Sequence, residues 1–281
     1  MTLGDPLAQT RARGGTGAIA RAAVFAPLPW WRLAWRWFEM LAIFFVGPTL
    51  WIMGVRLIGI IPTLLVVGAY GVLVLLTDRT FDRRMLWNTW AALREAPRIV
   101  VVWLVGAALI TLGVLAFAPD RFLEFPRRNP GLWVAVMCLY PIFSVYPQEL
   151  FCRAMFFHRY APLLGARPIT ATGDAMPRGV WRVIVVNAAA FGWLHVVFGH
   201  WLSVALTFAG GLLFAVTYVR ARSLAAAWLE HALYGCLVFT LGLGQFFYAG
   251  RNGRPPPERQ ERESTLVVPS EARADGTDPF E

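Results

Sequence analysis

The stretch Val183–Val219, with the sequence VIVVNAAAFGWLHVVFGHWLSVALTFAGGLLFAVTYV, contains 37 residues and no Asp, Glu or Arg. It is long enough for two membrane-spanning helices, since one span needs about 20 residues. A break between the two is expected at Phe198-Gly199-His200. Every backbone N–H and C=O must be paired in lipid, so each span is helical. The stretch therefore predicts an α-helical membrane protein.

The composition extends this prediction to the whole chain of 281 residues. Apolar residues make up 57% of the chain and charged residues 15%, whereas a soluble domain carries roughly 25% charged residues. These values exclude a disordered chain, a collagen-like repeat, a coiled coil and an ordinary soluble domain.

The other spans are located by further stretches that hold at most one charged residue. They are Trp37–Val55 (through Glu39), Leu57–Thr77, Ile99–Pro119, Asn129–Gln148 and Ala225–Gly250 (through Glu230). Together with the two spans above, they predict an all-α fold, a polytopic transmembrane helical bundle of about seven helices, or eight if an amphipathic segment also inserts.

This map divides the chain into three parts. Residues 1–30 form an N-terminal segment without the compact apolar run of a cleavable signal peptide, so the first helix is expected to remain as an anchor. Residues 31–250 form a single transmembrane domain. We expect residues 251–281 to be a disordered tail, because they contain Pro255-Pro256-Pro257, many charges and few large apolar groups.

Arginine supplies all 26 basic residues, and the net charge is +9. These arginines lie between apolar segments and not along one amphipathic face, which favours anionic lipid headgroups over nucleic acid as their partner. With the N-terminus inside, 17 arginines fall on the cytoplasmic side and 9 on the other, five of these in the C-terminal tail. The N-terminus and the loop at 154–182 are therefore predicted to be cytoplasmic, while the side of the tail is left open.

Three segments place ionisable side chains at membrane depth, where each costs from about 2.5 kcal/mol upward. Glu149 and Arg153 are four residues apart and can form a helix-end salt bridge. His195 and His231 lie in two further spans, where a single buried histidine is more often a satisfied core residue. If the three side chains are buried separately, each needs its own stabilising partner, whereas one shared polar cavity can stabilise all three. We therefore expect Glu149, His195 and His231 to face one cavity, equipped for general-base activation of water and for oxyanion stabilisation.

These segments resemble the three motifs of the CPBP family, the CAAX-protease and bacteriocin-processing group that is also called Abi and includes the Ras-converting CAAX endoprotease. That family carries EExxxR, FxxxH, and HxxxN or HxxxD on successive membrane helices. The corresponding sequences here are QELFCR at 148–153, FGWLH at 191–195 and HALYG at 231–235. The resemblance covers roughly residues 130–245.

The resemblance implies glutamate-dependent hydrolysis of a peptide bond within the membrane. It implies that Glu149, His195 and His231 are catalytic, and we assign supporting roles to Gln148, Arg153 and Asn187, the last on the same helix face as His195. Two positions depart from the family pattern. Gln148 replaces the first acid and can orient a water but not take its proton, and Gly235 has no side chain to donate to an oxyanion.

Alternatives remain open. The two departures favour a non-catalytic relative, a membrane scaffold or immunity protein that binds a peptide or partner helix. No cofactor is expected, and zinc held by Glu149, His195 and His231 is the alternative, although the sequence has no HExxH motif. A transporter would show inverted repeats, which are not seen.

The setting and the substrate are predicted only in outline. The use of Arg without Lys, together with many Ala, Gly and Trp residues, suggests a high-GC bacterial genome and hence the bacterial inner membrane. The expected partners are a peptide or membrane-protein substrate and the bilayer, with anionic lipids at the Arg-rich loops.

Overall fold

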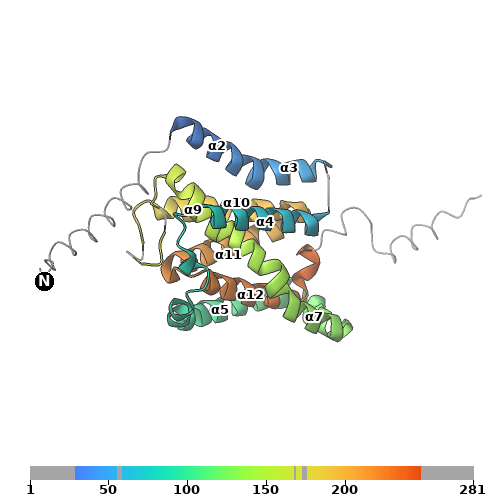
Figure 1. The fold of residues 1–281 in the computed structure, drawn as a ribbon. Coiled ribbons are helices and arrows are strands. Elements are labelled where there is room, and N and C mark those ends of the chain that lie inside the picture. The colour runs from blue at the N-terminus through green and yellow to red at the C-terminus, as the bar shows by residue number, and fades with distance from the viewer. Residues whose placement is uncertain (1–28, 56–58, 168, 173–175, 248–281) are drawn as a thin grey trace, which may run out of the picture. The chain divides into compact units, whose positions relative to one another are not determined.

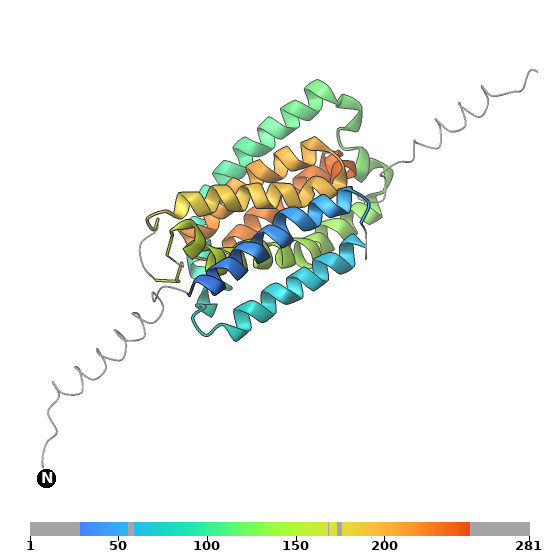
Figure 2. The same cartoon turned by 90° about the horizontal axis from the view of Figure 1, so that it is seen from above.

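The computed structural model describes residues 29–55, 59–167, 169–172 and 176–247. All regular secondary structure in these residues is helical. The predicted N-terminal segment, apart from its last two residues, and the predicted disordered tail both lie outside the described residues. Figures 1 and 2 show the helices packed side by side as a bundle.

The first helices are α2 (Trp30–Leu41) and α3 (Gly47–Ile52), joined by the π-helical turn η1 (Ala42–Val46), followed by α4 (Ile60–Thr77) and α5 (Thr89–Phe117). A long rod comes next, and contains α7 (Pro130–Tyr140), α8 (Tyr146–Glu149) and α9 (Phe156–Tyr160), with π-helical turns η4 (Pro141–Val145) and η5 (Leu150–Met155) between them. The last helices are α10 (Val180–Leu194), α11 (Trp201–Ala221) and α12 (Leu224–Thr240). The shorter elements are η2 (Arg83–Met85), η3 (Pro119–Arg121), α6 (Glu124–Arg128), η6 (Ala161–Leu164), η7 (His195–Phe198) and η8 (Leu243–Phe247).

The helical bundle predicted from the sequence is confirmed. Within the described residues, four helices are long and apolar enough to cross a membrane: Thr89–Phe117, Pro130–Leu164, Val180–Phe198 and Trp201–Ala221. Two more apolar helices, Pro62–Thr77 and Leu224–Thr240, are shorter. The break expected at 198–200 is found at Gly199, which has a φ of 75° and separates η7 from α11.

Three predicted boundaries are wrong. The helix expected at Ile99–Pro119 begins at Thr89, and the helix expected at Ala225–Gly250 ends at Thr240.

The span expected to end at Gln148 continues without interruption to Leu164, so Glu149 and Arg153 lie inside a helix and not at its end. Both side chains have no exposed surface. Because the opposite charges of Glu149 and Arg153 stabilise each other, the pair can lie inside a helix. The alternative of a salt bridge at a helix end is therefore excluded.

Apolar side chains divide between a core and an outer surface. On the core side, the Phe44 ring stacks on Phe151 at 4.8 Å and meets the edge of Phe156 at 5.1 Å. On the outer side, α5 leaves large apolar residues such as Leu104 and Leu109 more than half exposed. An exposed apolar helix surface of this kind suits lipid contact.

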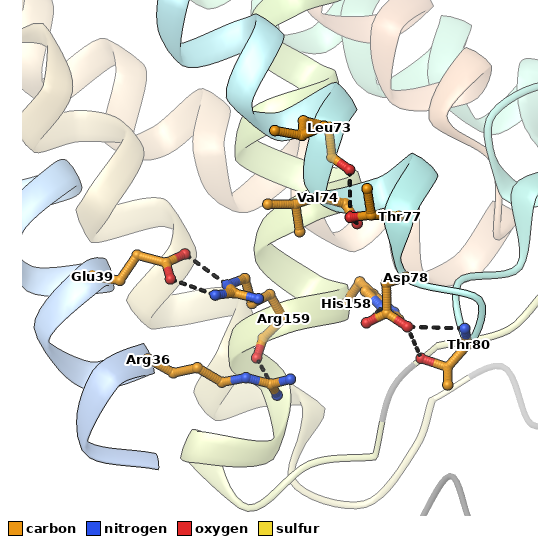
Figure 3. A network of polar contacts seen from close by, with 9 residues as sticks. All are labelled: Arg36, Glu39, Leu73, Val74, Thr77, Asp78, Thr80, His158 and Arg159. Atoms are coloured by element: carbon orange, nitrogen blue, oxygen red, sulfur yellow. Dashed lines mark hydrogen bonds and ion pairs between the residues drawn. The ribbon is translucent and has the colours of Figure 1, made fainter. Parts of the chain in front are cut away.

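A second buried polar network fixes one end of the bundle (Figure 3). Arg159 of α9 donates from Nε and Nη2 to the two oxygens of Glu39 in α2, at 2.6 and 2.5 Å. The Tyr160 hydroxyl donates to the same carboxylate at 2.7 Å, and Arg36 donates to the Arg159 carbonyl oxygen at 3.1 Å. Two-point pairing of this kind is among the stronger charge-assisted contacts, so it fastens α2 to α9.

A neighbouring group of polar contacts lies at the end of α4 and includes His158, the residue before Arg159. Asp78 accepts hydrogen bonds from the Thr80 backbone N–H and hydroxyl and lies 2.9 Å from His158 Nε2 (Figure 3). Burial raises the pKa of Asp78, but the hydrogen bonds from Thr80 and His158 outweigh that effect and lower the pKa to about 2. Asp78 therefore stays charged throughout the physiological pH range.

Four contacts gather the Arg-rich segments at a single end of the bundle. They are Arg36 with Arg159, His158 with Asp78, Arg220 with Glu95, and Arg222 with Thr170. This arrangement agrees with the assignment of these arginines to one side of the membrane, and the cytoplasmic identity of that side stays a prediction.

We predict that Glu39→Gln lowers the free energy of unfolding by about 3 kcal/mol, because it leaves the largely buried Arg159 guanidinium without its carboxylate. Thermal denaturation of the purified protein in detergent would measure this loss. The matched control is Glu124→Gln, whose partner Arg128 has a 75% exposed side chain, and which should cost less than about 1 kcal/mol. Equal losses in the two variants would contradict the structural importance of the Glu39 pair.

We also predict that a cysteine at position 121 is labelled by a membrane-impermeant thiol reagent from outside intact cells, and that one at position 167 is not. The reason is the excess of arginines at the end that includes Arg167. The Arg121→Cys and Arg167→Cys variants are made in a background in which the three native cysteines are replaced by serine. Labelling at 167 but not at 121 would reverse the orientation.

Candidate active site

Glu149 is placed by an irregular part of its helix. It is the last residue of α8, and the π-helical turn η5 begins at the next residue. A π turn widens the helix by one residue, and such turns are frequent at functional sites. Arg153 lies within the turn, and its Nε atom is 3.5 Å from Glu149 Oε2.

His231 of α12 meets the same carboxylate from another helix. His231 Nδ1 lies 2.9 Å from Glu149 Oε1. A carboxylate oxygen only accepts, so Nδ1 carries the proton and donates. The structure thus brings together Glu149, Arg153 and His231, which come from two segments more than 75 residues apart in the chain.

Aromatic rings enclose this charged group. The Arg153 guanidinium lies over the Phe191 ring at 4.6 Å and over the Phe214 ring at 5.8 Å. The His231 ring stacks on Phe214 with 4.7 Å between centroids. Because Arg153 Nε and Nη2 form no hydrogen bond, the ring faces and the Glu149 carboxylate together stabilise the buried cation.

His195 reaches the site across Phe191. Phe191 has its ring centroid 4.7 Å from that of His195 and 5.5 Å from that of His231. The sum of these distances is the upper limit on the separation of the two imidazoles, and it is below the roughly 12 Å that two side chains span through one or two bridging waters. The two histidines therefore lie within that limit of each other, with the Phe191 ring beside both.

The backbone fixes the tautomer of His195. Its Nδ1 lies 2.7 Å from the Phe191 carbonyl oxygen, within the same helical segment. A carbonyl oxygen accepts only, so Nδ1 carries the proton and Nε2 of neutral His195 offers a lone pair. An imidazole in this form can accept a hydrogen bond from water.

The supporting residues expected from the sequence have different surroundings. The Gln148 amide donates to Ser144 Oγ at 2.9 Å, one turn earlier in the same rod. Asn187 of α10 donates to the Cys152 carbonyl oxygen at 2.5 Å, and so holds the π turn that carries Arg153. Of the supporting residues, Arg153 touches Glu149, whereas Asn187 acts on the backbone beside it.

Tyr140 lies near the site and was not predicted from the sequence. At Gly235, one turn after His231, an added Cβ would lie 2.5 Å from the Tyr140 hydroxyl oxygen. The tip of Tyr140 therefore takes the space that a side chain at position 235 would need. No sequence pattern links a tyrosine at the end of α7 to a glycine nearly a hundred residues later, so this contact could not be predicted from the sequence.

Zinc held by Glu149, His195 and His231 stays a prediction. Within the part of the chain that the structure describes, no group of three His, Cys, Asp or Glu side chains is arranged to hold a metal ion. Arg153 beside Glu149 also repels a cation from that carboxylate.

An apolar surface groove of about 700 Å³ lies next to the site. Gly192, Trp193 and Val196 line it, and they belong to the same segment as His195. None of Glu149, His195 and His231 is among its lining residues.

Comparison with known proteins bears on this arrangement. The model of a family described as type II CAAX prenyl endopeptidase Rce1-like matches residues 129–237. All three motif segments lie in that range, and the match confirms the resemblance that they carry. At the level of the family it supports a CAAX-type intramembrane protease, and with the apolar helices it indicates a multi-pass membrane protein. No match was found among curated proteins or solved structures.

Proposed function

We propose that this membrane protein is an endopeptidase that hydrolyses a peptide bond of a membrane-associated substrate, with a water molecule activated by Glu149. The observation that carries the proposal is the fully buried Glu149 carboxylate, which accepts a hydrogen bond from His231 at 2.9 Å and lies 3.5 Å from Arg153. The family match over the same residues supports it. A buried charge with specific partners is a common mark of a catalytic group.

Glu149 has the properties that a general base needs. Its Oε1 atom is engaged by His231, while Oε2 forms no hydrogen bond and is available for a proton. The Arg153 guanidinium, 3.5 Å away, supplies the opposite charge. A base must be deprotonated before the reaction starts, so the ion pair is compatible with the role.

The proposed reaction balances as follows. The water oxygen forms a bond to the carbonyl carbon while one of its protons moves to Glu149 Oε2, and the carbonyl electron pair moves onto oxygen. When the C–N bond breaks, that proton passes to the amine nitrogen, so that an acid and an amine are released and Glu149 is again a carboxylate. His195 Nε2 holds the second hydrogen of the water, and Gln148 orients the water or the substrate.

The water needs a route to this base. Glu149 has no exposed surface, so the reaction includes an opening of the site. The groove beside His195 gives the approach, because Val196 lines it and follows His195 directly. We propose that the substrate enters from this side and admits water with it.

The competing function is a non-catalytic scaffold or immunity protein of the same family. It is favoured by the Gln148 side chain, which cannot take a proton and is bonded to Ser144, and by Gly235 in place of a donor. The closed site also suits a role in binding. The two functions differ in one measurable respect, which is the turnover of a peptide.

The membrane, the orientation of the chain in it and the substrate are also proposals. The arginine distribution supports a bacterial inner membrane protein with its N-terminus in the cytoplasm and its Arg-rich end against anionic lipid. The substrate is a membrane-associated peptide or protein. A prenylated CAAX peptide is the first probe, because the family description names that substrate class.

We predict that Glu149→Gln lowers kcat by 10²–10⁴-fold, because it removes the base and keeps the side-chain volume. The measurement uses protein in liposomes and a fluorescence-quenched peptide that ends in a farnesylated CAAX sequence, beside the same peptide without farnesyl. Full activity of Glu149→Gln, or no cleavage of either peptide by the wild-type protein, would contradict the proposal.

Two further variants complete this experiment. Glu230→Gln is the matched control, because Glu230 is equally buried but, within the described residues, neither of its carboxylate oxygens has a hydrogen-bond partner, and it should keep the wild-type kcat. Gln148→Glu restores the acidic pair of the family motif and should keep or raise kcat. Equal losses in Glu149→Gln and Glu230→Gln would show general damage and not the removal of a base.

A further inference from the structure

The oxyanion of the proposed reaction needs a donor that the motif residues do not readily supply. His231 donates from Nδ1 to Glu149, so in its neutral form its Nε2 has no hydrogen to give. Gly235 has no side chain. Preorganised donors at a developing oxyanion are usually the largest single contribution to catalysis, so the nearby polar groups are worth testing.

The Tyr140 hydroxyl is such a donor, and it lies against the face of α12 that carries His231. Gly235 follows His231 by four residues in α12, so the two positions share one face. A Cβ at Gly235 would lie 2.5 Å from Tyr140 Oη and 2.4 Å from its ring carbon Cε1. The phenol tip therefore lies against the backbone of α12, one turn from His231.

The phenol is held in position from two sides. Its ring meets the edge of Phe239 with 5.1 Å between centroids. The carbonyl oxygen of the next residue, Pro141, accepts a hydrogen bond from Trp228 Nε1 at 2.7 Å. Trp228 and Phe239 both belong to α12 and flank His231 and Gly235 along it, so Tyr140 cannot shift along the helix without losing one of these contacts.

The hydroxyl itself has no fixed partner. Within the described residues no hydrogen bond involves Tyr140 Oη. Tyr234, on the same helix, is different, because its hydroxyl donates to the Val102 carbonyl oxygen at 2.9 Å. The phenol is partly exposed, so its unused donor is accessible to a partner that arrives with the substrate.

We propose that the Tyr140 hydroxyl is the hydrogen-bond donor to the substrate carbonyl oxygen, replacing a side chain that position 235 lacks. This inference rests on the proposed function. The phenol keeps its proton throughout, and its O–H dipole stabilises the negative charge that forms when water adds to the carbonyl carbon. Because that charge exists mainly in the transition state, the donor acts on kcat more than on KM.

The test is Tyr140→Phe, which removes one oxygen atom and keeps the ring on Phe239. With the farnesylated quenched peptide in liposomes, we expect kcat to fall about 10²–10³-fold with KM within threefold of wild type. The melting temperature should not change, since the hydroxyl makes no internal hydrogen bond. Tyr234→Phe is the matched control, with an unchanged kcat and a lower melting temperature from the loss of its bond to Val102.

The outcomes separate this inference from the proposed function. If Glu149→Gln is inactive but Tyr140→Phe keeps kcat within threefold of wild type, Tyr140 is not the donor and the proposed function stands. If Tyr140→Phe and Tyr234→Phe lose the same activity, or if Tyr140→Phe lowers the melting temperature in step with kcat, the role is structural and the inference is wrong. If the wild-type protein cleaves neither peptide, both fail.

Discussion

Glu149 is a carboxylate without exposed surface inside a bundle of apolar helices, and the cost of removing it from water determines what must surround it. Arg153 supplies the opposite charge from one turn away, and His231 supplies a hydrogen bond from another helix. A buried ion pair contributes little net stability compared with apolar residues of equal size. Its presence here is one of the observations that support the catalytic role proposed above.

Contacts from other helices hold these side chains in position. Asn187 holds the Cys152 carbonyl oxygen and with it the π turn that orients Arg153. Phe191 and Phe214 line the guanidinium and the histidine rings, so the cation is sheltered by ring faces and not by water. The separate network around Glu39 and Arg159 joins α2 to α9 at the Arg-rich end of the bundle.

The sequence predicted the features that depend on local composition. Gaps between charged residues located the helices and the break at Gly199, because a lipid environment allows few other solutions. The charge gaps wrongly placed the end of a span at Gln148. The helix continues there because Glu149 and Arg153 stabilise each other. The grouping of ionisable residues followed from the cost of burying each alone, but the sequence could not show that Phe191 lies beside both histidines or that Tyr140 fills the space at Gly235. Such contacts depend on packing between distant segments.

The coupling between Glu149 and His231 in catalysis tests the account most directly. It is measured as kcat for Glu149→Gln, His231→Ala and the double variant, with the quenched peptide in liposomes. If the two residues act as one unit, the double variant loses no more activity than the more damaging single variant. If the two losses multiply, Glu149 and His231 act independently and the hydrogen bond between them is not the basis of the reaction.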